Sequence, residues 1–302
     1  MDVLAYFWEP AADLAFRRGW THGILALVLW PFVLTGVILA LDRALSRVRR
    51  ASLPSGLVPG QVLLLSSVAI LSHPMLDTLN TYGMRWLMPF SGRWFYGDTL
   101  FIVDPWLWLA LGAGVVLSRP GRGGTRPARI ALWLSFAYVA AMAVSTLAAR
   151  RIAGAEMAAI SGQAVDRLMV SPFPVNPFVR SIVAEQEGVY RTAGFRWLSD
   201  RRVEPGSVRV FPKGRVNHPA VQTAAATTVG RRFLVWARFP AFQVEPAGGN
   251  DFVVHMLDLR YADRPGVRFG WVSIPVTIRP ASEPSPDTLR PSSPDAPAAP
   301  AP

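Results

Sequence analysis

The sequence contains no cysteine and only one lysine, Lys213. Without cysteine the chain has no disulfide, no thiolate metal ligand and no cysteine nucleophile. Any metal site must therefore be built from aspartate, glutamate or the four histidines. The sequence also lacks a Gly-x-Ser-x-Gly elbow, a P-loop and a dinucleotide-binding fingerprint, which disfavours serine hydrolases with that elbow, nucleotidases and dehydrogenases.

Charged residues are scarce and make up 17% of the chain, against about 25% in soluble proteins. The net charge of +11 comes almost wholly from arginine. Such a charge can indicate nucleic-acid binding, but several arginines gather in short loops between apolar segments, where the positive-inside rule explains them. We therefore expect a membrane protein whose partner is the lipid bilayer, and no binding of nucleic acid.

Four apolar segments predict about four transmembrane helices in the first half of the chain. They cover residues 23–41, 62–79, 100–117 and 130–149. The first is uncharged over roughly 20 residues, which is enough to cross a hydrocarbon core of about 30 Å. Pro31 is expected to kink the first helix. The second helix should be interrupted at His73, because a residue before proline is displaced from the helical region.

The second half of the chain alternates apolar and polar residues and predicts a small β-rich soluble domain. The strands are expected as a hairpin within 181–197 and as single strands over 232–243, 252–261 and 267–278. The last residues are mostly Pro, Ala, Ser and Asp, which predicts disorder. The fold class is thus a mainly α membrane protein with three parts: a helical membrane domain (1–150), a β-rich domain (151–280) and a disordered tail (281–302).

Two arginine-rich loops, residues 42–50 and 119–129, predict the orientation of the helices. If both are cytoplasmic, the start of the first span, the end of the second and the start of the third meet at the opposite membrane face. Arg150 and Arg151 argue mildly against this topology because it places them outside. The ionisable residues expected to converge at this face are His22, His73, Asp77, Asp98 and Asp104.

His73 and Asp77 are four residues apart, which places them on one face of a helix. Imidazole and carboxylate ligands suit Zn²⁺ or Mn²⁺, so the pair predicts a metal site; the alternative is a hydrogen-bonded pair that joins two membrane helices. His22 has two readings of equal weight, a ligand or an interfacial imidazole beside a helix cap. Asp104 precedes Pro105 and is also explained as a helix cap, and Asp98 has the same ambiguity.

Between the second and third spans, residues 82–99 combine aromatic residues with arginines, a composition typical of the membrane interface. We expect this loop to lie along the bilayer surface. Arg85 and Arg93 are candidates to hold a phosphate or a lipid headgroup, although interfacial anchoring is the favoured explanation. His218 and His255 are expected to be ordinary residues of the β-rich part.

Four motifs agree in order and spacing with a known family. They are Arg17-Arg18-Gly19-Trp20-Thr21-His22-Gly23, His73-Pro-Met-Leu-Asp77 running to Tyr82-Gly83, Pro89-Phe90-Ser91, and Ile102-Val103-Asp104-Pro105. Most of residues 1–150 resembles the YdjM-like family of bacterial inner-membrane proteins. The resemblance implies a metal-dependent hydrolase and, through similarity to the zinc-dependent phospholipase C group, phosphoester chemistry.

The chain departs from this family in two respects. Family members typically carry an earlier membrane segment with its own Thr-His motif, ending in Pro-Asp-x-Asp, and Asp2 resembles the last residue of that motif. We expect either that the protein extends upstream of Met1 or that this member has lost the segment. Arg17 or Arg18 stands where many relatives have a histidine, which removes one ligand implied by the resemblance.

Together these observations predict a membrane-bound metal-dependent hydrolase of the inner membrane. Its site and its C-terminal domain are expected on the non-cytoplasmic side, its cofactor is a divalent metal, zinc or manganese, and its substrate is amphiphilic or a phosphoester. The alternative is a non-catalytic membrane scaffold with a structural His/Asp cluster. The predicted residues are His22, His73, Asp77 and Asp2 as metal ligands, with Asp104 and Asp98 as catalytic residues.

Overall fold

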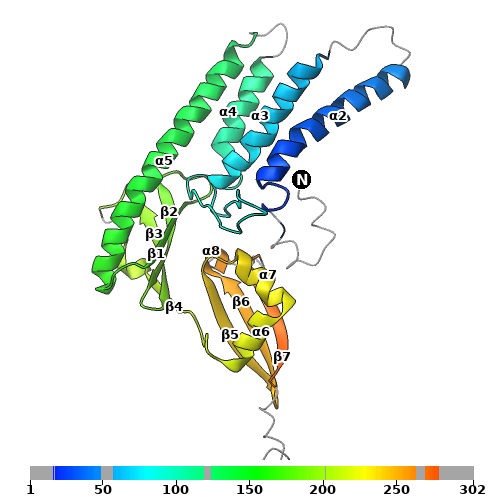
Figure 1. Ribbon diagram of the computed structural model, residues 1–302. Coiled ribbons are helices and arrows are strands. Elements are labelled where there is room, and N and C mark those ends of the chain that lie inside the picture. Colours follow the sequence, from blue (N-terminus) through cyan, green and yellow to red (C-terminus); the bar gives the residue numbers. More distant parts are fainter. Residues whose placement is uncertain are drawn as a thin grey trace, which may run out of the picture.

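The computed structural model describes residues 16, 18–48, 57–118, 124–200, 202–262 and 269–278. Four helices lie side by side at one end, and two separate sheets with short helices lie at the other (Figure 1). A loop of residues 79–104 lies between these two parts. Asp2 and the tail predicted to be disordered, residues 281–302, lie outside the described residues.

The helical part consists of α2 (Ile24–Val48), α3 (Pro59–Thr78), α4 (Pro105–Leu117) and α5 (Arg126–Ser161). Of the helices in the described ranges, α2, α3 and α5 are long and apolar enough to cross a membrane. The expectation of about four such helices is therefore wrong by one. The segment 100–117 forms a helix of only 13 residues, because Asp104 caps it and residues 100–104 stay outside it.

The expected interruption of the second helix is also wrong. Helix α3 continues through Pro74 to Thr78, and α2 likewise continues through Pro31. Proline inside a helix removes one backbone hydrogen bond, and membrane helices tolerate this when neighbouring groups bind the exposed carbonyls. Pro74 leaves the carbonyl of Ile70, four residues earlier, without its helical donor, and α3 nevertheless stays helical to Thr78. His73 therefore keeps its helical position although a proline follows it.

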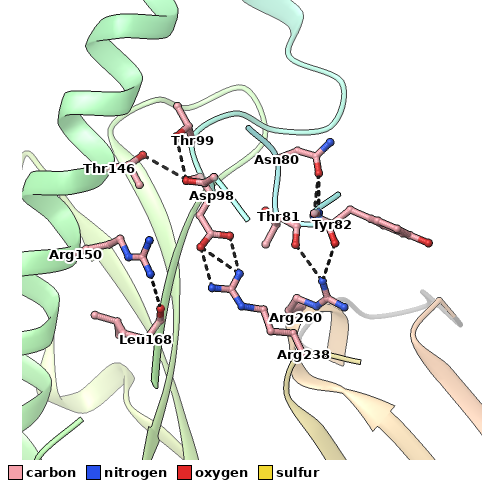
Figure 2. A network of polar contacts seen from close by, with 12 residues as sticks. Asn80, Thr81, Tyr82, Asp98, Thr99, Thr146, Arg150, Leu168, Arg238 and Arg260 are labelled. Atoms are coloured by element: carbon pink, nitrogen blue, oxygen red, sulfur yellow. Dashed lines mark hydrogen bonds and ion pairs between the residues drawn. The ribbon is translucent and has the colours of Figure 1, made fainter. Parts of the chain in front are cut away.

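Helix α5 is much longer than a bilayer requires. Its 36 residues correspond to about 54 Å at 1.5 Å per residue. Its C-terminal part buries Ala149, Ala153 and Met157 against a sheet, and Arg150 Nη2 donates to the Leu168 carbonyl at 3.1 Å (Figure 2). The domain boundary expected at residue 150 lies inside this continuous helix.

The first sheet is antiparallel, with the strand order β1 (Arg167–Pro172), β2 (Val179–Gln186), β3 (Val189–Arg196), β4 (Arg209–Pro212). The expected hairpin within 181–197 is confirmed as β2 and β3, which turn at Glu187 and Gly188. A 3-10 turn, η2 (Pro205–Ser207), precedes β4. The inward faces of this sheet pack on the end of α5 through Val170, Ile182 and Phe195.

The second sheet has the order β5 (Pro240–Gly248), β6 (Asp251–Asp258), β7 (Trp271–Thr277), with α6 (Pro219–Ala226), α7 (Thr228–Trp236) and α8 (Leu259–Ala262) beside it. The strand expected over 232–243 is wrong in its first half, which forms the end of α7. Thr227 caps this helix by accepting from Gly230 N at 3.0 Å. Phe233 and Trp236, three residues apart, are then buried together.

Two arginines next to the second sheet hold the loop of residues 79–104 (Figure 2). Arg238 lies just before β5, and Arg260 lies in α8. Arg238 binds both carboxylate oxygens of Asp98, with the shortest contact 2.8 Å. Arg260 Nη1 donates to the carbonyls of Thr81 and Tyr82 at 3.0 and 3.2 Å. The aromatic residues of this loop, expected along the bilayer surface, include Tyr82, which packs in the core around Trp236.

In the Asp98–Arg238 ion pair, the Asp98 carboxylate is completely shielded from solvent, with 0% of its side chain exposed. We predict that Arg238→Ala destabilises the protein by about 3–5 kcal/mol, because it leaves an uncompensated buried charge. Arg196→Ala, which removes an exposed arginine of β3, should change stability by about 0.5 kcal/mol or less. Denaturant unfolding in detergent measures both. Equal effects of the two substitutions would contradict the prediction.

Candidate functional site

Three of the predicted ligands lie together where α2 begins and α3 ends. His22 lies just before α2, and His73 and Asp77 lie in the last part of α3. One ligand atom from each residue lies within 4.8 Å of those from the other two. The His22 and His73 rings have their centroids 5.4 Å apart, and His73 Nε2 is 3.4 Å from Asp77 Oδ2. The convergence expected from the loop charges is thus confirmed for these three residues.

The position of His22 depends on close packing between the start of α2 and the loop that follows α3. Ile24 N donates to the Trp86 carbonyl at 3.0 Å, and Gly23 N donates to the Gly19 carbonyl at 2.6 Å. A Cβ at Gly23 would lie 2.4 Å from the Met88 carbonyl oxygen. Glycine is therefore required next to His22, because any side chain would push the loop away.

Arg18 and Asn80 orient the carboxylate of Asp77. Arg18 Nη2 lies 3.1 Å from Asp77 Oδ1, and Arg18 Nη1 donates to Asn80 Oδ1 at 2.9 Å. The Arg18 guanidinium also covers the Tyr82 ring at 4.5 Å. One oxygen of Asp77 thus faces Arg18, and the other faces His73. The sequence did not predict these roles; Asn80, in the polar stretch after Asp77, was the only local signal.

The three residues differ in their exposure to solvent. His22 is 1% exposed, whereas the side chains of His73 and Asp77 are 60% and 16% exposed. The cluster is therefore anchored on a buried imidazole and opens to the outside at His73. A small molecule can approach it from that side.

The donor set fits a divalent metal. Two imidazoles and one carboxylate form the three-ligand arrangement of catalytic zinc sites, which leave a further position for water or substrate. Ligands at about 2.1 Å from a tetrahedral ion are about 3.4 Å apart. The distance from His73 Nε2 to Asp77 Oδ2 is 3.4 Å, whereas the full set, within 4.8 Å, would close slightly around an ion.

Asp104 lies outside this cluster and caps α4. Its Oδ1 accepts from Trp106 N at 3.1 Å and from Leu107 N at 3.3 Å, and its Oδ2 accepts from the Tyr138 hydroxyl at 3.0 Å. Both oxygens therefore have structural partners, which matches the capping explanation. A catalytic role for Asp104 stays a prediction.

Asp98 also lies outside the cluster, in the ion pair with Arg238. The Arg238 guanidinium stacks on the Tyr96 ring, 4.2 Å from its centroid. Burial raises the pKa of Tyr96, and the charges of Arg260 and Arg238 offset part of this rise. The ring is therefore neutral at physiological pH. The contacts assign Asp98 to the junction with the C-terminal region, and its catalytic role stays a prediction.

Arg85 does not present its charge to solvent as a headgroup ligand would. It is 4% exposed, and its guanidinium covers the Trp94 ring at 4.9 Å. Burial lowers the pKa of Arg85, whereas Tyr82 and Tyr96 raise it. Among the two arginines considered for lipid headgroups, only Arg93 is exposed.

The close approach at Gly23 gives a direct test of how His22 is positioned. Gly23→Ala should destabilise the protein by about 1–3 kcal/mol, because the new methyl group meets a backbone oxygen. The matched control is Gly36→Ala in α2, where a Cβ has no neighbour within 4 Å; it should be neutral or stabilise by up to about 1 kcal/mol. Unfolding in detergent measures both. A neutral Gly23→Ala would contradict this packing.

In comparison with protein families, residues 1–152 match the family described as YdjM inner membrane protein. Comparison with curated proteins gives no match, and neither does comparison with solved structures. The matched range covers half of the chain and contains His22, His73 and Asp77. The resemblance carried by the four motifs is thereby confirmed, and the chain belongs to the YdjM inner membrane protein family.

Proposed function

We propose that the protein is a membrane-bound metal-dependent hydrolase whose divalent cation is held by His22, His73 and Asp77. The observation that carries the proposal is the convergence of these ligand atoms within 4.8 Å, from a loop and a helix. Ionisable groups at the end of apolar helices are costly unless they pair, bind an ion or face water. Two imidazoles beside a carboxylate satisfy this requirement well when they share a cation.

The surrounding residues hold the ligands in fixed orientations. Thr21 Oγ1 lies 2.7 Å from His22 Nδ1, and Arg18 and Asn80 bind Asp77 Oδ1 at 3.1 and 3.5 Å. Such outer contacts set the tautomer of a histidine ligand and the direction of a carboxylate. A bound zinc or manganese ion supplies Lewis acidity and activates water for hydrolysis.

The location of the cluster favours an amphiphilic substrate with a phosphoester group. Met75 and Leu76, in the same turn of α3 as His73, are 61% and 49% exposed. An acyl chain has apolar surface to contact there, while its polar end reaches the cluster. Arg18 neutralises the charge of Asp77, so a bound divalent cation would keep its charge and attract an anionic phosphoester.

The family and the apolar helices place the protein in a membrane. We propose in addition that the cluster and the C-terminal region lie on the non-cytoplasmic side, since the arginines near the end of α2 (Arg43, Arg47) and at the start of α5 (Arg126, Arg129) lie at the opposite end of the helices (Figure 1). Arg150, which argued against this topology, is held by the Leu168 carbonyl of β1. It belongs to the part of α5 that packs on the sheet.

A structural cluster is the second candidate, and one contact favours it. Asp77 Oδ1 already has an ionic partner in Arg18 at 3.1 Å. A scaffold protein would use these contacts to join α2, α3 and the following loop. The scaffold hypothesis predicts that the wild-type protein binds no metal and that substitution of His73 or Asp77 lowers its stability. The hydrolase hypothesis predicts that the wild-type protein binds metal and that the same substitutions remove it.

We predict that purified wild-type protein binds a divalent metal and that His73→Ala and Asp77→Ala each abolish stoichiometric binding. His73 is largely exposed, so its substitution removes a ligand with little effect on the fold. His255→Ala is the matched control, because this histidine lies in β6, away from the cluster. Metal analysis after gel filtration measures the bound ion. Stoichiometric metal that is unaffected by both substitutions would refute the proposal.

Asn80→Ala tests the orientation of Asp77. Loss of an outer contact lowers metal affinity by about 10–100-fold, and we expect a decrease in this range for zinc, measured by competition with a chelator. Asn250→Ala is the control, since this exposed asparagine lies in the turn between β5 and β6. If the zinc affinity of the Asn80→Ala variant equals that of the wild-type protein, the Asp77 carboxylate does not need the contact with Asn80.

A further inference from the structure

The connection between β1 and β2 is an exposed apolar loop without charge. Residues 173–178 read Phe-Pro-Val-Asn-Pro-Phe. Phe173, Val175 and Phe178 are 51%, 61% and 52% exposed. Large apolar side chains that are grouped on the surface indicate a binding surface, whereas single exposed apolar side chains do not.

The backbone of this loop is largely satisfied from within. Phe173 N donates to the Val179 carbonyl at 3.0 Å, Asn176 N to the Pro174 carbonyl at 2.7 Å, and Phe178 N to Asn176 Oδ1 at 3.0 Å. Pro174 and Pro177 have no N–H to satisfy. A non-helical segment enters an apolar medium only when its backbone groups have such partners.

Val175, at the centre of the loop, has a strained backbone with φ of 67°. Positive φ is unfavourable for a β-branched residue, and such strain is typical of segments under a functional constraint. The Val175 carbonyl accepts from Trp106 Nε1 at 2.8 Å. Trp106 lies in the first turn of α4, so this contact holds the tip of the loop at the end of that helix.

The apolar surface of the loop continues onto the helical part. Beyond Trp106, α4 exposes Trp108 and Leu109, which are 71% and 65% exposed, and Ile102 and Val103 just before the helix are 49% and 59% exposed. Because the family is one of inner membrane proteins, we take these exposed apolar side chains of α4 to face lipid. An indole that donates a hydrogen bond at one end and is apolar elsewhere is typical of the membrane interface.

We propose that residues 173–178 insert into the bilayer beside α4 and give the C-terminal region a second membrane contact. Its partner is the acyl-chain region of the lipid leaflet next to the cluster. This inference does not depend on a metal or on hydrolysis. It implies that the first sheet is held against the membrane surface by its β1–β2 end.

The absence of native cysteine makes a direct test possible. Val175→Cys introduces a unique thiol for an environment-sensitive fluorophore in the full chain, and Phe173→Cys is a second position if the first variant misfolds. Val210→Cys is the matched control: Val210 is 57% exposed in β4, which pairs with the opposite end of β3. The labelled proteins are reconstituted in phosphatidylethanolamine–phosphatidylglycerol vesicles with or without a lipid that carries a doxyl quencher on its acyl chain.

The label at position 175 or 173 should emit at shorter wavelength than the label at 210, and the doxyl lipid should reduce its emission at least twofold. The label at 210 should be unaffected. Emission at 175 and 173 that equals that at 210 would overturn the proposal. A blue-shifted label that the doxyl lipid does not quench would also overturn it, since protein, such as a second copy of the chain, would then cover the loop.

Discussion

The buried ion pair of Asp98 with Arg238 determines how the two parts of the molecule fit together. A carboxylate that is fully shielded from water is stable as an ion only with a charged partner at close distance, and that partner comes from the C-terminal region. Arg260 adds hydrogen bonds to the carbonyls of Thr81 and Tyr82. Asn80, the residue before Thr81, binds both Arg18 and Asp77. The cluster and the C-terminal region are therefore linked through one short stretch of loop.

The parts of the site that follow local rules were predictable from the sequence. The spacing of His73 and Asp77 on a helix, and the charges of the loops that bring His22 to the same end, need only helical geometry and the positive-inside rule. The contact between Asp98 and Arg238 joins residues 140 positions apart, and no local pattern announces it. Arg18 was noticed only as a departure from the family motif, because its role depends on a three-dimensional contact.

The errors in the fold have local physical causes. Proline disfavours the helical region for the residue before it, yet α3 continues through Pro74 to Thr78, since a long apolar segment in a membrane pairs its backbone groups only as a helix. The segment 100–117 is apolar apart from Asp104, but Asp104 and Pro105 start the helix late. The alternating pattern around residue 232 suggested a strand, whereas the Thr227 cap favoured a helix. In the first case the apolar length of the segment outweighed the effect of proline, and in the other two a cap set where the helix begins.

The charges of the cluster bear on the proposed substrate. Asp77 and Arg18 form an ion pair whose charges cancel, and a histidine that ligates a metal is neutral. Among the described residues of the cluster, a divalent cation held there would leave a net charge of two. Beside apolar helices such a charge is costly, since the effective dielectric constant is lower than in water. An anionic phosphoester balances it, whereas a neutral ester does not. By neutralising Asp77, Arg18 thus supports the proposal of an anionic substrate.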